Sequence, residues 1–129
     1  APELENEARY YRAQSLVKVN QMAHAVADWQ SLAQDTRNAY GAEAKYQLAQ
    51  YLFDTGKTAD AEKEVLNYLE VSTPHTYWLA RSFVLLSDIY AKLDRKLEAR
   101  QYLLSLKQNY QADDDIAGMI ESRLEKLNE

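Results

Sequence analysis

Small side chains recur at a nearly constant interval along this chain, and no other feature limits the possible folds as strongly. Ala25, Ala61 and Ala99 are separated by 36 and then by 38 residues. Bulkier apolar residues follow each alanine at the fourth and seventh positions. They are Trp29, Val65 and Leu103, then Leu32, Tyr68 and Leu106. Because these offsets place side chains on one helical face, the interval predicts a repeated amphipathic helix.

The same interval governs the residues upstream of each alanine. A small residue stands twelve positions before it, a larger one nine positions before it, and a turn-tolerant residue five positions before it. These sets are Ala13, Ala49 and Ser87; Leu16, Leu52 and Tyr90; and Asn20, Gly56 and Asp94. Gly and Asn reach left-handed backbone angles at low cost, which suits the end of a helix. Each unit is therefore predicted to be a helix, a short turn and a second helix that crosses the first closely at the small residues.

This pattern resembles the tetratricopeptide repeat. The best match is residues 42–70, and residues 81–110 match nearly as well. The matching positions are Tyr46, Leu48, Ala49, Leu52, Gly56, Ala61 and Val65, then Phe83, Leu86, Ser87, Tyr90 and Ala99. The first unit departs from the family at Arg12 and Asn20, the family's proline between units is missing, and the junctions are 2 to 4 residues longer than usual. The resemblance covers about 105 of 129 residues.

The resemblance implies an all-α fold of antiparallel helix pairs stacked into a right-handed superhelix. We expect one domain over 1–129, with repeat units near 6–39, 42–73 and 80–111 and a capping helix near 113–128. Seven helices are predicted near 3–18, 22–35, 39–55, 58–70, 74–92, 96–110 and 114–128.

Local signals support two of these helix starts. Thr73 and Pro74 look like an N-cap and a first helical residue. The acidic run 113–115 suits the positive end of a helix dipole. The last helix places four apolar residues on one face, which predicts a cap over the last repeat. They are Ile116, Ile120, Leu124 and Leu127.

The sequence of residues 77–110, which is followed by an acidic turn and by "IESRLEKL", is similar to the C-terminal ends of large tetratricopeptide proteins from Bacteroides-like bacteria. Such proteins are often associated with the cell envelope and have no assigned function. The resemblance implies a fragment or processed chain, with a periplasmic or cell-envelope location, and it supplies no activity.

Charge and composition argue against several classes of function. The formal net charge is −5, so the chain lacks the cationic surface on which nucleic-acid affinity depends. It contains no cysteine, which excludes disulfides and thiolate ligands. No apolar run reaches the ~20 residues of a membrane span. We therefore expect no nucleic-acid partner and no membrane insertion.

No catalytic, metal or cofactor site is predicted. His24 and His75 lie in different repeats, and neither has a second histidine at helical spacing. The run from Asp113 looks like a calcium loop but places Ala117 and Leu124 where oxygen ligands belong. We read the chain as not an enzyme and as having no cofactor.

The family resemblance implies that the first helix of each pair lines a concave groove. The groove positions it gives are Glu7, Tyr10, Gln14 and Val17 in the first unit; Glu43, Tyr46, Gln50 and Phe53 in the second; and Arg81, Val84, Asp88 and Ala91 in the third. Tyr offers contact area at low entropic cost, and Gln can pair with a peptide backbone. The tyrosines can equally pack between neighbouring repeats. The Lys and Asn residues with which some tetratricopeptide domains grip a carboxylate are missing.

Two functions follow from this reading. The first is a protein–protein interaction scaffold that holds a peptide or partner segment in the groove. The alternative is a structural end cap or spacer of a longer solenoid, with self-association as a homodimer through uncovered apolar surface.

Overall fold

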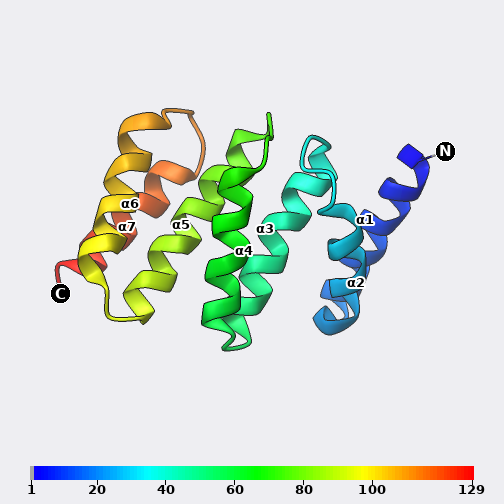
Figure 1. The fold of residues 1–129 in the computed structure, drawn as a ribbon, viewed down its shortest axis with the longest axis horizontal. Helices are drawn as coiled ribbons and strands as arrows, with labels where there is room; N and C mark the ends of the chain where they lie inside the picture. Colours follow the sequence, from blue (N-terminus) through cyan, green and yellow to red (C-terminus); the bar gives the residue numbers. More distant parts are fainter. Residues whose placement is uncertain (1) are drawn as a thin grey trace. The chain divides into compact units, whose positions relative to one another are not determined.

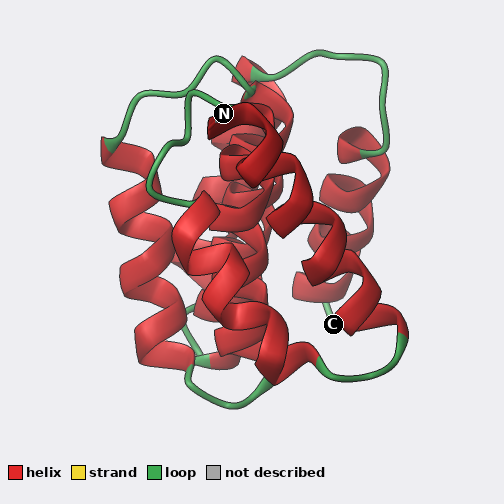
Figure 2. Ribbon diagram, turned by 90° about the vertical axis from the view of Figure 1, so that its right-hand side faces the viewer, coloured by secondary structure: helices red, strands yellow, loops and turns green. Residues whose placement is uncertain are grey.

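Helices and the loops that join them make up the described part of the chain. A computed structural model describes residues 2–129, and over these residues it contains seven α-helices and no β-strand (Figures 1 and 2). The helices are α1 (Pro2–Lys18), α2 (Met22–Leu32), α3 (Ala39–Asp54), α4 (Thr58–Glu70), α5 (Thr76–Lys92), α6 (Lys96–Asn109) and α7 (Ile116–Leu127). The prediction of an all-α chain is confirmed.

Backbone contacts divide the chain into two units, with the boundary inside α5. The N-terminal unit ends at Leu79, and the C-terminal unit runs from Ala80 to Glu129. In the N-terminal unit α1 packs against α2, α2 against α3 and α3 against α4, while α1 touches α3 more lightly. In the C-terminal unit α6 packs against α7. Helices that are neighbours in sequence are therefore neighbours in space within each unit.

Three short turns, after α1, α3 and α5, have the same backbone geometry. Asn20, Gly56 and Asp94 adopt positive φ angles of 61°, 85° and 60°. In each turn the residue with positive φ donates its N–H to the carbonyl three residues back, at 3.0 to 3.1 Å. The next residue donates to the carbonyl five residues back, at 2.7 to 2.8 Å. This pair of bonds is a Schellman motif, so the predicted turn-tolerant positions end three helices in the same way.

The recurring small residues lie where the helices of a pair meet. Ala25, Ala61 and Ala99 have no exposed surface at all. Their upstream counterparts are equally buried, namely Ala13, Ala49 and Ser87. A larger side chain at either position would hold the two helices apart, because helix axes approach only as closely as the residues at the crossing allow.

Each unit buries its own apolar side chains. In the N-terminal unit a core cluster forms from α1, α2 and α3, and it consists of Ala13, Ala25, Trp29, Leu32, Ala44 and Leu48. In the C-terminal unit the largest fully buried apolar residues are Leu85, Leu86, Ile89, Leu103 and Ile116. As predicted, Ile116, Ile120 and Leu127 turn inward from α7, and Leu124 is half-buried.

The two longer junctions of the N-terminal unit are bonded to each other. Thr36 donates its side-chain O–H to the carbonyl of Ser72 at 3.0 Å, and Thr73 donates to the carbonyl of Thr36 at 2.7 Å. The ring Nε2 of His75 lies 3.0 Å from the carbonyl oxygen of Arg37. The buried Thr36 is thus the centre of a clasp between the α2–α3 and α4–α5 junctions.

Gly41 is required by a close approach at the α2–α3 junction. A Cβ atom at this position would lie 1.9 Å from the carbonyl oxygen of Asp35 and 2.5 Å from that of Leu32. Asn38 begins α3 by accepting the N–H groups of Tyr40 at 2.9 Å and Gly41 at 3.3 Å with its side-chain oxygen. The first turn of α3 is therefore pressed against the preceding junction.

Three predicted helix boundaries differ from the structure by two or three residues, namely the end of α2 and the starts of α5 and α7. α2 ends at Leu32, three residues early, because the following residues form the junction that reaches the α4–α5 loop. α5 begins at Thr76 and not at Pro74, because the hydroxyl of Thr73 bonds to Thr36 in the other junction while also accepting the N–H of His75 at 3.1 Å. The acidic run 113–115 does precede α7, and Asp114 accepts the N–H of Ile116 at 2.9 Å.

Candidate binding groove

In the N-terminal unit, three of the predicted groove residues form a chain of hydrogen bonds between α1 and α3. Tyr10 donates its O–H to Oε1 of Glu43 at 3.0 Å, and Gln14 donates its side-chain N–H to the hydroxyl of Tyr10 at 2.8 Å. Tyr10 is half-buried, and its ring lies 4.4 Å from that of Tyr40 between centroids. Burial, with Glu43 as the next cause, raises the pKa of Tyr10 to about 12, so its hydroxyl stays protonated and keeps donating at neutral pH.

A pocket of about 350 Å³ opens beside this hydrogen-bonded chain. Its wall combines polar groups from α1 and α3 with an apolar base. The lining residues are Tyr10, Gln14, Val17, Lys18, Met22, Trp29, Glu43, Ala44 and Gln47. Small-molecule and peptide sites typically combine apolar walls with a few oriented polar groups. Four predicted positions (Tyr10, Gln14, Val17 and Glu43) therefore share one pocket.

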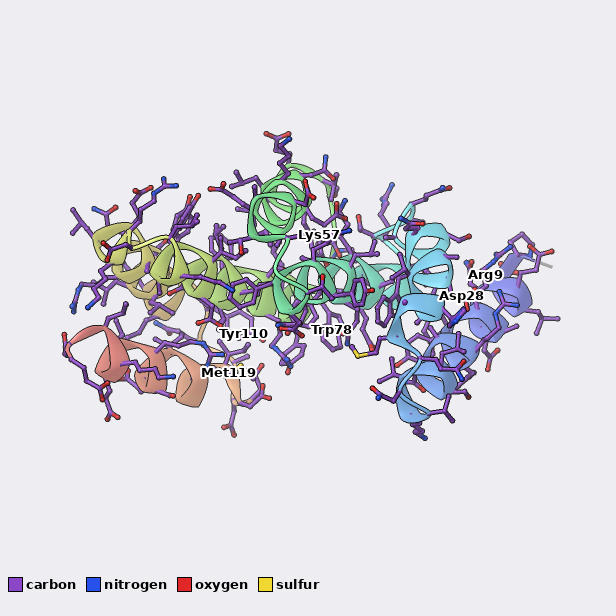
Figure 3. The ribbon with its side chains drawn as sticks, turned by 90° about the horizontal axis from the view of Figure 1, so that it is seen from below. Arg9, Asp28, Lys57, Trp78, Tyr110 and Met119 are labelled. Atoms are coloured by element: carbon purple, nitrogen blue, oxygen red, sulfur yellow. The ribbon has the colours of Figure 1, made fainter. Side chains whose placement is uncertain are left out.

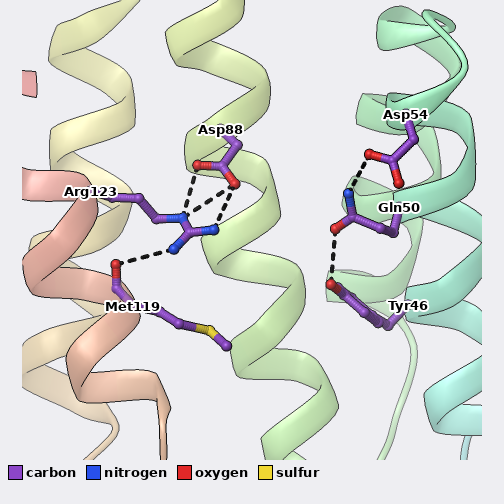
Figure 4. A network of polar contacts seen from close by, with 6 residues as sticks. All are labelled: Tyr46, Gln50, Asp54, Asp88, Met119 and Arg123. Carbon is purple, nitrogen blue, oxygen red and sulfur yellow. Dashed lines mark hydrogen bonds and ion pairs between the residues drawn. The ribbon is translucent and has the colours of Figure 1, made fainter. Parts of the chain in front are cut away.

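The second set of predicted positions forms a polar chain along α3. Tyr46 donates its O–H to Oε1 of Gln50 at 2.9 Å, and Gln50 donates to Oδ1 of Asp54 at 2.8 Å (Figure 4). Tyr46 is only 5% exposed, and its ring packs 5.6 Å from that of Trp78. The Tyr46 ring therefore serves packing, while Gln50 is half-buried and Asp54, at the other end of the hydrogen-bonded chain, is exposed.

In the C-terminal unit the predicted position Asp88 is held by α7. Arg123 Nε lies 3.0 Å from Asp88 Oδ1, and Arg123 NH2 lies 3.2 Å from Oδ2 (Figure 4). Burial raises the pKa of the Asp88 carboxyl above its usual value, and Arg123 partly offsets this rise. Val84 is buried, so it has little surface to offer a partner.

The remaining predicted positions are spread over helix surfaces. Glu7 is exposed, Phe53 and Arg81 are half-buried, and Ala91 is exposed. None of these four lines the pocket between α1 and α3. Four of the predicted groove positions therefore share one pocket in the N-terminal unit, and the others lie singly on the helices.

Two features near the predicted groove positions could not be recognised from the sequence alone. The base of the pocket is formed by Trp29, Met22 and Ala44, whose apolar pattern reads simply as core. A second hollow of about 630 Å³ lies among α2, α3 and α4, where Lys45 Nζ bridges Glu64 at 2.9 Å and Asn67 at 2.6 Å. Lys45, Glu64 and Asn67 all line this second hollow.

Charged groups also join α1 and α2, at a position where the sequence departs from the resembled family. Arg12 stands where the resembled family prefers leucine, and its guanidinium binds the buried carboxylate of Asp28, with Nε 2.8 Å from Oδ2. Figure 3 shows Asp28 between α1 and α2. This ion pair could not be predicted from neighbouring residues in the sequence, because its two members are 16 positions apart.

In residues 2–129 no group of three or more His, Cys, Asp or Glu side chains is arranged to hold a metal ion. Within the same residues, no helix is long and apolar enough to cross a membrane.

Comparison with known proteins adds no relative. No protein-family model, curated protein sequence or solved structure matches the chain significantly.

Proposed function

We propose that the chain is a protein-interaction module of the tetratricopeptide type, which holds a segment of a partner polypeptide against the first helices of its pairs. The observation that carries this proposal is the pocket of about 350 Å³ between α1 and α3. It contains Tyr10, Gln14 and Glu43, which the resemblance to the tetratricopeptide family implies as groove positions. The three equal Schellman turns support the repeat character of the chain.

The chemistry of the pocket suits a peptide. Gln14 and Gln47 carry amide groups that can donate to and accept from a peptide backbone. Met22 and Trp29 form an apolar base that can receive one side chain of the partner. Tyr10 is held in one orientation by two hydrogen bonds, so little entropy is lost when it is covered.

Selection of peptides from a random library against the whole chain tests this function. We expect Gln14→Ala to weaken the selected peptides about fivefold to tenfold, since one peptide hydrogen bond contributes about 1 kcal/mol. Gln14 is exposed, so the fold should keep its helical circular dichroism. Gln101→Ala, an equally exposed change on α6, is the matched control.

Unchanged affinity in Gln14→Ala, together with unchanged affinity when Val17→Asp places a charge in the pocket, would show that peptides bind elsewhere. In that case the groove assignment is wrong.

Self-association as a structural spacer remains the second candidate, and one observation favours it. Leu4 and Tyr11 stand seven residues apart on one face of α1 and are 67% and 53% exposed. Light scattering over a hundredfold range of concentration should show a dimer that Leu4→Glu with Tyr11→Glu abolishes. A monomer at all concentrations excludes self-association through this face of α1.

A further inference from the structure

The exposed face of α6 carries an apolar stripe with cations on one flank. Leu97 and Leu104 stand seven residues apart, so they share one side of the helix, and they are 70% and 47% exposed. Lys96 lies one residue before Leu97 and Arg100 three residues after it, which places both cations on the same flank of the stripe. α6 contains three basic residues and one acidic residue, within a chain whose formal net charge is −5. This face is therefore apolar and basic in an acidic protein.

The exposed face of α1 repeats this pattern with the opposite charge. Leu4 and Tyr11 again stand seven residues apart, and more than half of each side chain is exposed. Glu3 lies one residue before Leu4 and Glu7 three residues after it, so the carboxylates take the same places beside their stripe as the two cations take on α6. The two helices thus offer matched apolar stripes with complementary charges.

The charged groups of both rows are open to a partner. Glu3, Glu7 and Lys96 are exposed, and within residues 2–129 their side chains make no hydrogen bond or ion pair. Arg100 donates one N–H of its guanidinium to the neutral amide oxygen of Asn128 at 2.9 Å. It therefore keeps its charge and its other donors for a carboxylate.

The positions of the two rows determine the direction in which α1 and α6 can meet. On each helix, viewed from its N-terminus, the charged row lies on the same side of the apolar stripe. When two such helices face each other in parallel, the rows lie on opposite sides of the contact. When they run antiparallel, the rows lie on the same side, so carboxylates meet cations.

We propose that α1 of one copy of this chain packs antiparallel against α6 of a second copy. The apolar stripes make the contact, and the row of Glu3 and Glu7 lies beside the row of Lys96 and Arg100. This inference rests on the second candidate function, self-association, and narrows it by naming the surface that receives α1. It is independent of peptide binding, because none of these residues lines the pocket between α1 and α3.

Two blocked variants test the contact. Leu4→Glu with Tyr11→Glu blocks α1, and Leu97→Glu with Leu104→Glu blocks α6. All four side chains are exposed, so both variants should keep their helical circular dichroism. Each variant alone should be monomeric in light scattering at concentrations where the unchanged chain associates. Their equimolar mixture should form a 1:1 complex, because each variant supplies the surface that the other lacks.

Charge exchange tests the pairing of the two rows. Lys96→Glu with Arg100→Glu should weaken association about tenfold or more, because two attractions become repulsions. Adding Glu3→Lys and Glu7→Lys to the same chain should restore association, since the charges are then exchanged. Lys63→Glu reverses an exposed charge on α4 and is the matched control, with unchanged association. Association of the unchanged chain should weaken as salt rises from about 0.05 to about 0.5 M.

The outcomes separate this inference from the candidate function on which it rests. If the α6-blocked variant associates as strongly as the unchanged chain, α1 does not pack against α6; the inference is then wrong, and self-association stands. A mixture of blocked variants that stays monomeric, or a charge exchange that restores nothing, also overturns the contact. If the unchanged chain is monomeric throughout, both the inference and self-association through α1 are wrong, and the peptide-binding proposal is unaffected.

Discussion

The N-terminal unit joins the helices of its pairs with ion pairs, whereas the C-terminal unit uses aromatic rings at matching positions. In the first pair Arg12 binds Asp28, and in the second Lys45 binds Glu64 at 2.9 Å. Asp28 and Glu64 are both the third residue after the buried alanine of their unit. The second helix of each of these two pairs, α2 and α4, therefore carries a carboxylate at the same position of the repeat.

In the C-terminal unit this point carries Tyr102. Its ring lies 6.0 Å from that of Phe83, which occupies the position of Lys45, and 5.5 Å from that of Tyr90. Arg95 in turn lies 4.4 Å above the centre of the Tyr90 ring. An aromatic cluster thus replaces an ion pair, while the turn between the two helices keeps the same hydrogen bonds.

The small residues and the turns therefore define the helix pair, and the remaining contacts between its two helices are exchangeable. A partly buried ion pair and an aromatic pair can make similar net contributions, because the Coulomb attraction of the ions is offset by the loss of their hydration.

The largest predicted difference between the two units concerns glycine. Gly41→Ala should lower the free energy of unfolding by about 3 kcal/mol, the upper end for overpacking, because the new Cβ would meet two backbone carbonyls. Gly118→Ala in α7 meets nothing within 4 Å and should raise stability by about 0.5 kcal/mol. Urea titrations of both variants measure this contrast. An unchanged free energy of unfolding in Gly41→Ala would show that the backbone of the α2–α3 junction moves aside at little cost.

The shared helix crossing is tested by enlarging its alanines. Ala61→Leu and Ala99→Leu should each cost about 1–3 kcal/mol, because both side chains are fully buried where two helices cross. Ala59→Leu on the exposed face of α4 should stay within about 0.5 kcal/mol. If only one of the two buried sites responds in chemical denaturation, the units do not share this geometry.

The three Schellman turns should respond in opposite directions to glycine and alanine. Gly56→Ala should cost about 1–2 kcal/mol, because its φ of 85° is unfavourable for a residue with a Cβ. Asn20→Gly and Asp94→Gly relieve the same strain and should gain less than about 1 kcal/mol. Melting temperatures of the three variants check this prediction, and a loss of stability in both glycine variants would contradict it.

The smallest effect should come from the ion pairs themselves. Glu64→Gln should cost about 0.5 kcal/mol at low salt and less at 1 M salt, because screening weakens the attraction of Lys45. Tyr102→Phe, the matching change in the C-terminal unit, keeps the ring contacts and should show no salt dependence. Equal salt dependence in both variants would remove the chemical distinction between the units.

Repetition in the sequence predicted the parts of the fold that depend on local chemistry. The buried alanines and the positive φ angles at Asn20 and Gly56 follow from side-chain size and backbone freedom, and both properties are set by the residue type. The boundary errors at Leu32 and Thr76 have another origin. Both arise from the clasp between two junctions, and bonds between residues 36 positions apart leave no local trace.

The candidate site was predictable to a similar degree. The family resemblance implied Tyr10, Gln14 and Glu43 as groove positions, and these three residues do form one hydrogen-bonded group. It could not foresee that α7 would place Arg123 on Asp88, because that contact depends on how the last helix folds back against the C-terminal unit. The register gives a position, and tertiary packing decides whether that position stays accessible.

The clasp around Thr36 has a practical consequence for labelling this chain. An insertion or protease cut in the α2–α3 junction would sever hydrogen bonds that two connecting segments share. The turn at Gly56 is exposed, an added Cβ there would meet nothing within 4 Å, and its backbone bonds join only residues of the adjoining α3 and α4. A short affinity tag or fluorophore-bearing loop spliced in beside Gly56 should therefore leave helix content and melting behaviour unchanged.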